Sequence, residues 1–167
     1  MPSQSSPFHI RPARPHESKL ILDLIRGLAE YEKLAHEVVA TEQDIQAALF
    51  GKKPSAECLI AELDDIAIGF ALFFHNFSTF AGKLGLYLED LYIKPEFRGR
   101  GFGRKMLAHL ANLAVQRGCA RFEWAVLDWN APAIRFYESL GAKIMHDWKI
   151  NRLTDDALQK LAAEARD

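Results

Sequence analysis

Cysteine is scarce, neither sign of charge is in excess, and no hydrophobic run is long. The 167 residues contain two cysteines, Cys58 and Cys119, which are too few for a disulfide framework and favour a reduced, cytoplasmic protein. The longest apolar run, residues 66–74, is interrupted by Gly69 and falls far short of the roughly 20 residues of a membrane span. A formal net charge of -1 provides no overall field that would attract nucleic acid or an anionic membrane, so neither partner is expected.

The spacings that hold metal ions and the segments that direct secretion are also missing. The six histidines are scattered, and no pair forms a His-x-x-x-His spacing, so we expect no metal. Residues 1–7 have neither a charged head nor an apolar stretch, and we expect a disordered tail there. With 49% hydrophobic residues, 26% charged residues and no internal repeat, the chain is predicted to be one globular domain over residues 1–167.

The order of the expected elements changes midway along the chain. In the first half the strand candidates follow one another closely, and Asp64 with Asp65 is typical of a two-residue hairpin turn. In the second half, strands alternate with helices around a glycine-rich loop. This order predicts a mixed α/β fold, with a mostly antiparallel sheet of about six or seven strands flanked by helices. The expected strands are residues 8–11, 58–63, 66–75, 85–93, 121–127 and 144–151, and the expected helices are residues 16–33, 41–51, 103–117, 132–141 and one that begins at Thr154.

The most specific segment is residues 98–105, Arg-Gly-Arg-Gly-Phe-Gly-Arg-Lys, between an expected strand and an expected helix. Its three glycines let a ligand approach the backbone, and the following helix directs free N–H groups and the positive end of its dipole at that ligand. Arg98, Arg100, Arg104 and Lys105 add positive charge, so the loop is predicted to bind a pyrophosphate. The alternative is a tight glycine turn with a solvated basic rim.

Two motifs connect this loop to a known family. The pattern Arg98-x-x-Gly101-x-Gly103, after an apolar strand and before an amphipathic helix, resembles the acyl-CoA pyrophosphate loop of the GNAT superfamily of N-acetyltransferases. Residues 128–142 resemble the later motif of that superfamily, in which an Asn and a Phe-Tyr pair flank the thioester end of the cofactor. Further segments resemble the diamine acetyltransferase subfamily, and most of all its thialysine Nε-acetyltransferase branch; they are residues 28–34, 87–90 and 125–130.

The resemblance implies the GNAT acyl-CoA acyltransferase fold, acetyl-CoA as co-substrate, and a homodimer to whose surface Trp148 would contribute. It also implies N-acetylation of a primary amine on a small molecule, either a thialysine- or lysine-like amine or a polyamine, by direct attack in a ternary complex. Ser78 stands where polyamine-acetylating members carry an acidic residue, which disfavours spermidine. Two alternatives stay open: acetylation of a protein or peptide amine, and a non-catalytic CoA-binding regulatory module.

Glu89 and Tyr137 are the catalytic candidates. An alkyl amine has a pKa of about 10.4 and is almost wholly protonated at pH 7, so the acceptor needs a base. The resemblance assigns that role to Glu89, whose burial in an apolar strand would raise its pKa, with Asp90 on the opposite face. The alternative for Glu89 is a surface carboxylate on an edge strand. By the same resemblance Tyr137 protonates the leaving thiolate, and its alternative is a core aromatic on a helical stripe.

The other candidate residues also follow from the resemblance. The backbone N–H groups of Leu91 and Ile93, freed where the strands splay, would bond the acetyl carbonyl and the pantetheine arm. A carboxylate near a cationic substrate is favourable, although Glu32 could equally pair with His36 on its own helix. The cofactor-binding residues are expected to be Leu91, Tyr92, Ile93, Arg98, Gly99, Arg100, Gly101, Phe102, Gly103, Arg104, Asn130, Ala133 and Tyr137. The substrate-binding residues are expected to be Tyr31, Glu32, Glu89, Glu123, Trp124 and Ala125.

Overall fold

The computed structural model describes residues 7–165, which form two compact units that meet in sequence between Leu127 and Asp128. The first unit holds the sheet and three of the long helices, and the second holds two further helices. Apart from Pro7, the tail expected over residues 1–7 lies outside the described residues.

A five-stranded sheet in the order β1-β2-β3-β4-β5 forms the centre of the first unit. Neighbouring strands from β1 to β4 are antiparallel, and β5 is parallel to β4, which confirms the predicted mixed, mostly antiparallel sheet. Asp64 and Asp65 both have positive φ, as the predicted two-residue hairpin turn between β2 and β3 requires. The strands are β1 (Phe8–Pro12), β2 (Glu57–Leu63), β3 (Ile66–Ser78), β4 (Lys83–Ile93) and β5 (Arg121–Trp124).

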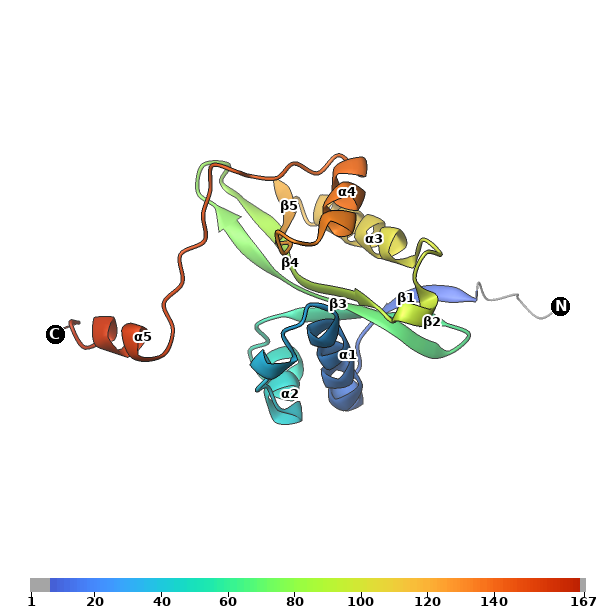
Figure 1. Ribbon diagram of the computed structural model, residues 1–167, viewed down its shortest axis with the longest axis horizontal. Coiled ribbons are helices and arrows are strands. Elements are labelled where there is room, and N and C mark those ends of the chain that lie inside the picture. The colour runs from blue at the N-terminus through green and yellow to red at the C-terminus, as the bar shows by residue number, and fades with distance from the viewer. Residues whose placement is uncertain (1–6, 166–167) are drawn as a thin grey trace. The chain divides into compact units, whose positions relative to one another are not determined.

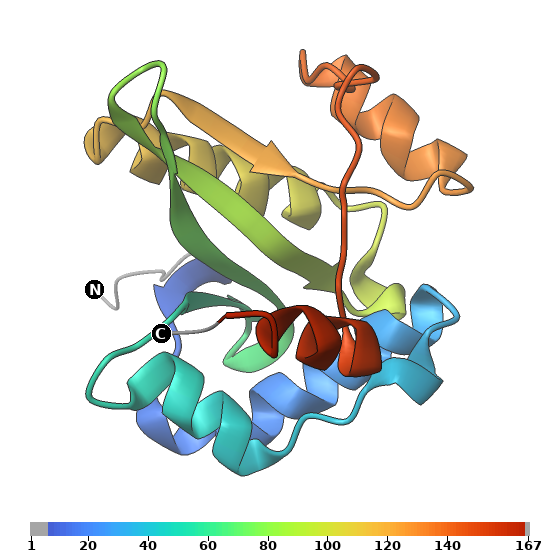
Figure 2. The same cartoon turned by 90° about the vertical axis from the view of Figure 1, so that its left-hand side faces the viewer.

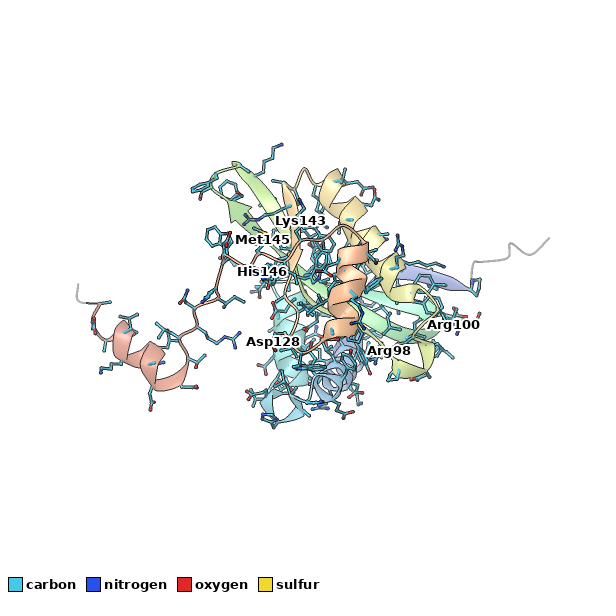
Figure 3. All side chains as sticks on the ribbon, turned by 45° about the horizontal axis from the view of Figure 1, so that its top comes forward. Arg98, Arg100, Asp128, Lys143, Met145 and His146 are labelled. Atoms are coloured by element: carbon cyan, nitrogen blue, oxygen red, sulfur yellow. The ribbon has the colours of Figure 1, made fainter. Side chains whose placement is uncertain are left out.

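Helices cover both faces of this sheet. Figures 1 and 2 show α1 (Ser18–Tyr31) and α2 (Glu42–Phe50) on one face and α3 (Phe102–Gln116) on the other. The apolar side chains of α1 are buried against Phe70 and Tyr92 of the sheet, as expected for an amphipathic helix. The loop before α3 carries Arg98 and Arg100 (Figure 3). Three short 3-10 helices are η1 (Pro15–Glu17), η2 (Ala35–Glu37) and η3 (Pro95–Phe97).

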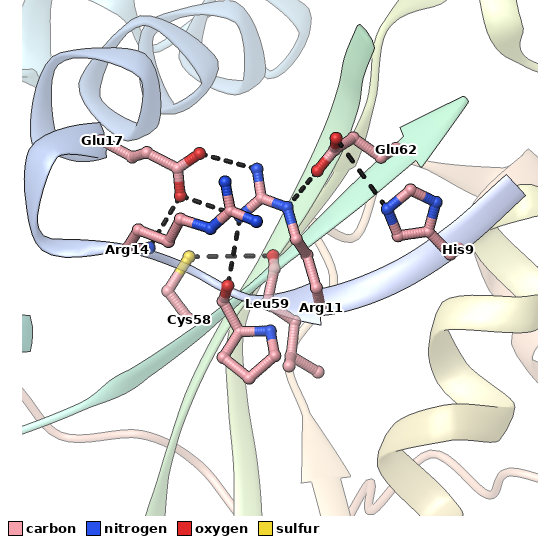
Figure 4. Close-up of polar contacts among 8 residues, drawn as sticks. His9, Arg11, Arg14, Glu17, Cys58, Leu59 and Glu62 are labelled. Atoms are coloured by element: carbon pink, nitrogen blue, oxygen red, sulfur yellow. Dashed lines mark hydrogen bonds and ion pairs between the residues drawn. The ribbon is translucent and has the colours of Figure 1, made fainter. Parts of the chain in front are cut away.

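A network of buried charges attaches β1 to the start of α1 (Figure 4). Both terminal nitrogens of the Arg11 guanidinium donate to the Glu17 carboxylate, over 2.9 and 2.6 Å, while Arg11 Nε donates to Glu62 on β2. Glu17 and Glu62 are each less than 10% exposed. The hydrogen bonds from Arg11 hold the pKa of Glu17 below its usual value despite the burial. These two carboxylates therefore share one guanidinium.

The second unit contains α4 (Ala131–Ser139) and α5 (Asp155–Ala162). The side-chain oxygen of Asn130 caps α4 by accepting from the Ala133 N–H over 3.4 Å, and Pro132 lies in the first turn, as predicted. The prediction of a strand over residues 144–151 is wrong: in this unit, as far as residue 165, no strand forms. A strand needs a neighbouring strand to bond its N–H and C=O groups, and an alternating sequence cannot supply one by itself. The predicted six or seven strands are accordingly five.

No helix within residues 7–165 is long and apolar enough to cross a membrane.

Candidate active site

The glycine-rich loop has the backbone shape that only glycine adopts readily. Gly99 and Gly101 have φ values of 73° and 81°, in the left-handed region, and Gly101 is the N-cap residue of α3. A Cβ atom built at Gly99, Gly101 or Gly103 would meet no atom within 4 Å. Gly99 and Gly101 are therefore favoured by the backbone turn, and no described residue fills the space above the three glycines.

The first turn of α3 is suited to an anion. Its first hydrogen bond runs from the Lys105 N–H to the Gly101 carbonyl over 3.1 Å, so the N–H groups of Phe102, Gly103 and Arg104 have no partner within the helix. No side chain of the described residues caps this end, and no acidic residue lies in the first turn. The helix dipole and the exposed Arg100 and Arg104 add positive potential. The loop fits the predicted pyrophosphate by its unpaired N–H groups and its open glycine surface.

The Arg98 side chain is engaged differently from its neighbours. Its Nε donates to the Ile93 carbonyl over 2.8 Å. Its guanidinium carbon lies 4.5 Å from the ring centroid of Tyr31 and 5.4 Å from that of Tyr92. Arg98 was predicted to bind the pyrophosphate. In this structure its side chain instead contacts Ile93, Tyr31 and Tyr92, which all belong to the first unit.

One edge of β4 is open beyond the end of β5. The two strands pair only from Gly85 to Leu88, so the last five residues of β4 have no neighbouring strand on that side in the described part of the chain. The Lys94 N–H donates to the Ile68 carbonyl of β3 over 2.8 Å, and N–H groups two residues apart point to the same side of a strand. The N–H groups of Leu91 and Ile93 must therefore point to the open edge. This is the arrangement that was predicted for groups that bind the acetyl carbonyl and the pantetheine arm.

A β-bulge at Glu89 separates the surroundings of the two adjacent acidic residues. Leu72 pairs with Asp90 while Phe73 pairs with Leu88, so Glu89 is the extra residue and has no cross-strand partner. Glu89 is exposed, so the expected burial is wrong. Asp90 is half-buried and lies on the α1–α2 face, because its partner Leu72 packs against the core beneath those helices. The bulge shifts the alternation of side chains by one residue, which sequence periodicity does not reveal.

Asp90 is a carboxyl group whose pKa the fold raises strongly. Burial raises its pKa to about 6, and the negative charges of Glu89 and Glu32 add to the effect. Burial also raises the pKa of Glu32, the C-cap residue of α1. No hydrogen bond or ion pair neutralises Asp90 in the described part of the chain. Asp90 was not predicted as a functional residue, and its only signal in the sequence was its place beside Glu89 in an apolar strand.

The predicted substrate-binding residues of the first unit lie at the ends of α1 and β5. Tyr31 is the last residue of α1 and is 40% exposed. Glu123 pairs in register with Tyr87 of β4, and the charges of Glu89 and Glu123 add to burial in raising the pKa of Tyr87. The expected alternative for Glu32, a pair with His36, is not found within residues 7–165, where His36 lies 3.3 Å from Glu37. Trp124 ends β5, and Ala125 directly follows it.

The remaining candidates, Asn130, Ala133 and Tyr137, belong to the second unit. Asn130 and Ala133 form the cap of α4, and the Tyr137 ring lies 5.6 Å from that of Phe136 on the same helix. Their grouping with Glu89 stays a prediction that the sequence motif carries.

Among residues 7–165 no three His, Cys, Asp or Glu side chains cluster so that they could hold a metal ion.

The fold and the loop define an α/β protein whose helix terminus is suited to an anionic cofactor. The family model described as the acetyltransferase (GNAT) family matches residues 22–142. The chain belongs to this family, and it is an acyltransferase that carries out N-acetylation. Acetyl-CoA is the acyl donor of the family.

Two relatives match nearly the whole chain. The thialysine N-epsilon-acetyltransferase of Sus scrofa is 38% identical over 93% of this chain and 97% of its own length. The L-ornithine N5-acetyltransferase of Arabidopsis thaliana is 32% identical over 91% of this chain and 86% of its own length. Among solved structures, an integron cassette protein from the mobile metagenome of V. cholerae has a TM-score of 0.80 at 26% identity, covering 95% of this chain and 99% of that one.

Proposed function

We propose that the protein transfers an acetyl group from acetyl-CoA to the side-chain amine of a small, lysine-like amino acid. The observation that carries this is the un-neutralised Asp90 beside Glu89 and Glu32, at the open edge of β4 and in the same unit as the glycine loop. Uncompensated carboxylates favour a cationic guest, and an alkylammonium group is such a guest.

The glycine loop would hold the cofactor. The N–H groups of Phe102, Gly103 and Arg104 meet the pyrophosphate, and Arg100 supplies further positive charge. Gly99 and Gly101 keep the backbone accessible. The N–H groups of Leu91 and Ile93 would donate to the acetyl carbonyl and to the pantetheine arm, with Tyr92, Asn130 and Ala133 as further candidates. When bound, acetyl-CoA supplies an activated acetyl thioester.

The proton of the acceptor would go to the Glu89–Asp90 pair. The amine attacks only in its neutral form, so an ammonium must lose a proton first. Burial raises the pKa of Asp90 to about 6, which is closer to neutral pH, and the exposed Glu89 beside it provides a second carboxylate. At the end of transfer the hydroxyl of Tyr137 gives its proton to the departing sulfur, which makes the thiol a better leaving group.

The acceptor would lie against the end of α1 and the end of β5. Tyr31 and Glu32 come from the first, and Glu123, Trp124 and Ala125 from the second. The named relatives act on thialysine and L-ornithine, and each of these is an amino acid with a side-chain amine. This common chemistry favours an amino acid over spermidine, in agreement with Ser78 at the polyamine position.

A thiol-release assay tests the proposal. Acetyl-CoA is offered with thialysine, lysine, ornithine, spermidine, putrescine and a lysine peptide, and cofactor binding is measured by calorimetry in parallel. We expect the amino acids to release thiol fastest. Turnover of the peptide alone would establish the second candidate, a protein amine acceptor. Cofactor binding without thiol release from any acceptor would overturn the proposed acceptor site.

We also propose that the protein works as a cytoplasmic homodimer. The two cysteines form no disulfide among residues 7–165, and Trp148 is an exposed aromatic of the second unit, which would suit an interface. Sedimentation of the whole chain at micromolar concentration tests the assembly, and a monomer would overturn it.

A further inference from the structure

One side chain lies between the glycine loop and the end of α1. Arg98 opens the loop in sequence, yet its guanidinium is directed at Tyr31 of α1 and at the β4 backbone. The loop is the proposed cofactor subsite, and Tyr31 belongs to the proposed acceptor subsite. Both lie in the first unit.

The position of this guanidinium is fixed in two ways. The hydrogen bond from Arg98 Nε to the Ile93 carbonyl is 2.8 Å long and anchors the guanidinium at its Nε atom. The Tyr31 ring centroid lies 4.5 Å from the guanidinium carbon, and this cation–π contact fixes the orientation of the guanidinium. A lysine could keep the charge but has neither the Nε donor nor the planar face.

The surface behind Arg98 is rigid. The Tyr92 ring, 5.4 Å from the guanidinium carbon, is buried in the core below α1. Tyr92 also lies so close to α1 that a Cβ atom at Gly27 would be 2.6 Å from its hydroxyl oxygen. Because α1 and β4 meet tightly at this point, the loop cannot move at Arg98 without disturbing the contact with Tyr31.

We propose that Arg98 is a positioning residue that couples the two subsites, so that binding of the cofactor and orientation of Tyr31 support each other. The acceptor half of this inference rests on the proposed function, and the cofactor half does not. Suppose that the cofactor and the acceptor both need Arg98 to be ordered. The ligand that binds first then loses the conformational entropy of ordering Arg98, and the second ligand binds without that cost. The coupling is reciprocal, so a change at Tyr31 must also weaken cofactor binding.

The first experiment measures the dissociation constant of CoA by calorimetry in the whole protein, with no acceptor present. Tyr31→Leu removes the ring, and Tyr31→Phe is the matched control that keeps it. We expect Tyr31→Leu to weaken CoA binding by about three- to tenfold, the range of a cation–π contact, and Tyr31→Phe to bind as the native protein does. Equal CoA binding by Tyr31→Leu and the native protein would overturn the proposal. Thermal unfolding checks that both variants are folded.

The second experiment replaces the other partner. Arg98→Met should weaken CoA binding, and the double variant with Tyr31→Leu should be no weaker than Arg98→Met alone, because each change removes the same contact. Multiplicative effects of the two changes would contradict the coupling. With an acceptor that turns over, native protein should bind it at least about fivefold tighter when CoA is present, and Arg98→Met should lose this difference. A panel in which no acceptor turns over would refute the proposed function and leave the CoA results to decide the coupling.

Discussion

Two groups of acidic side chains in the first unit each contain a carboxyl group withdrawn from water, but the pKa values of these two carboxyl groups, Glu17 and Asp90, shift in opposite directions. Glu17 and Glu62 are buried and share the guanidinium of Arg11, which holds the pKa of Glu17 below its usual value. Asp90 is half-buried beside Glu89 with no cationic partner among residues 7–165, and its pKa rises to about 6. Burial acts on both in the same direction, so the difference is the partner. A neutralised carboxylate supports the fold, whereas one left without a cation is available to a ligand.

Removing the cation from the first group should have the largest effect. Arg11→Met leaves two carboxylates without their cationic partner. We expect it to lower the free energy of unfolding at pH 7 by about 3 to 5 kcal/mol, as measured by urea denaturation. Because the folded pKa of Glu17 is lowered, its contribution is present above about pH 4.5 and is lost as the pH falls. The loss should therefore shrink in acid. Arg14→Met, an exposed neighbour, is the control, and an equal loss there would refute the assignment.

Removing the charge from the second group should affect activity instead. Asp90→Asn keeps the size of the side chain and should lower kcat/KM for the preferred amine by about 10²-fold. In the native enzyme kcat/KM should rise with pH through an apparent pKa of about 6, because the ionised form accepts the proton. The variant should lose this step. A pH profile that keeps the step in Asp90→Asn would assign it to another group.

The same substitution should stabilise the fold. The folded pKa of Asp90 is raised, so the native carboxyl is protonated more readily than the unfolded one, and its contribution to stability is lost as the pH rises through about 6. Above that pH, the free energy of unfolding of Asp90→Asn should be about 1 to 2 kcal/mol larger than that of the native protein. Near pH 4 the two free energies of unfolding should be equal. Lower stability of the variant at pH 8 would mean that Asp90 has a cationic partner.

A third carboxylate shows the effect of exposure. Glu57 accepts two hydrogen bonds from Arg117, over 2.6 and 2.9 Å, at the surface where β2 meets the end of α3, and these bonds lower its pKa. Water screens this pair, so Glu57→Gln should cost at most about 1 kcal/mol. Raising the salt concentration should reduce the cost further. A loss of stability as large as that of Arg11→Met would mean that burial does not explain the difference between the Glu57–Arg117 pair and the Arg11 network.

Local signals predicted the loop and the hairpin correctly. Gly99 and Gly101 occupy positions where the backbone needs positive φ, and Asp64 with Asp65 forms the expected turn. Such features depend on a few neighbouring residues, so the sequence contains nearly all the information. The predicted α4 begins where Asn130 caps it, for the same reason.

Features that depend on distant partners were predicted less well. Residues 144–151 alternate as a strand does, yet within residues 128–165 no neighbouring strand accepts them. Glu89 was expected to be buried because it lies in an apolar strand, but it is the extra residue of a bulge against β3 and is exposed. Neither the pairing nor the bulge is visible in one strand taken alone.

The sequence by itself determined the mixed α/β class, the glycine loop at the start of α3 and the family to which the motifs belong, because each follows from local backbone preference or from short patterns of residues. Only the tertiary structure decided which of two adjacent carboxyl groups is perturbed, and that Arg98 contacts Tyr31 across 67 positions of sequence. Both depend on how β4 lies against β3 and α1. Burial and charge act through space, so the residues that set the chemistry of Asp90 are neighbours only after folding.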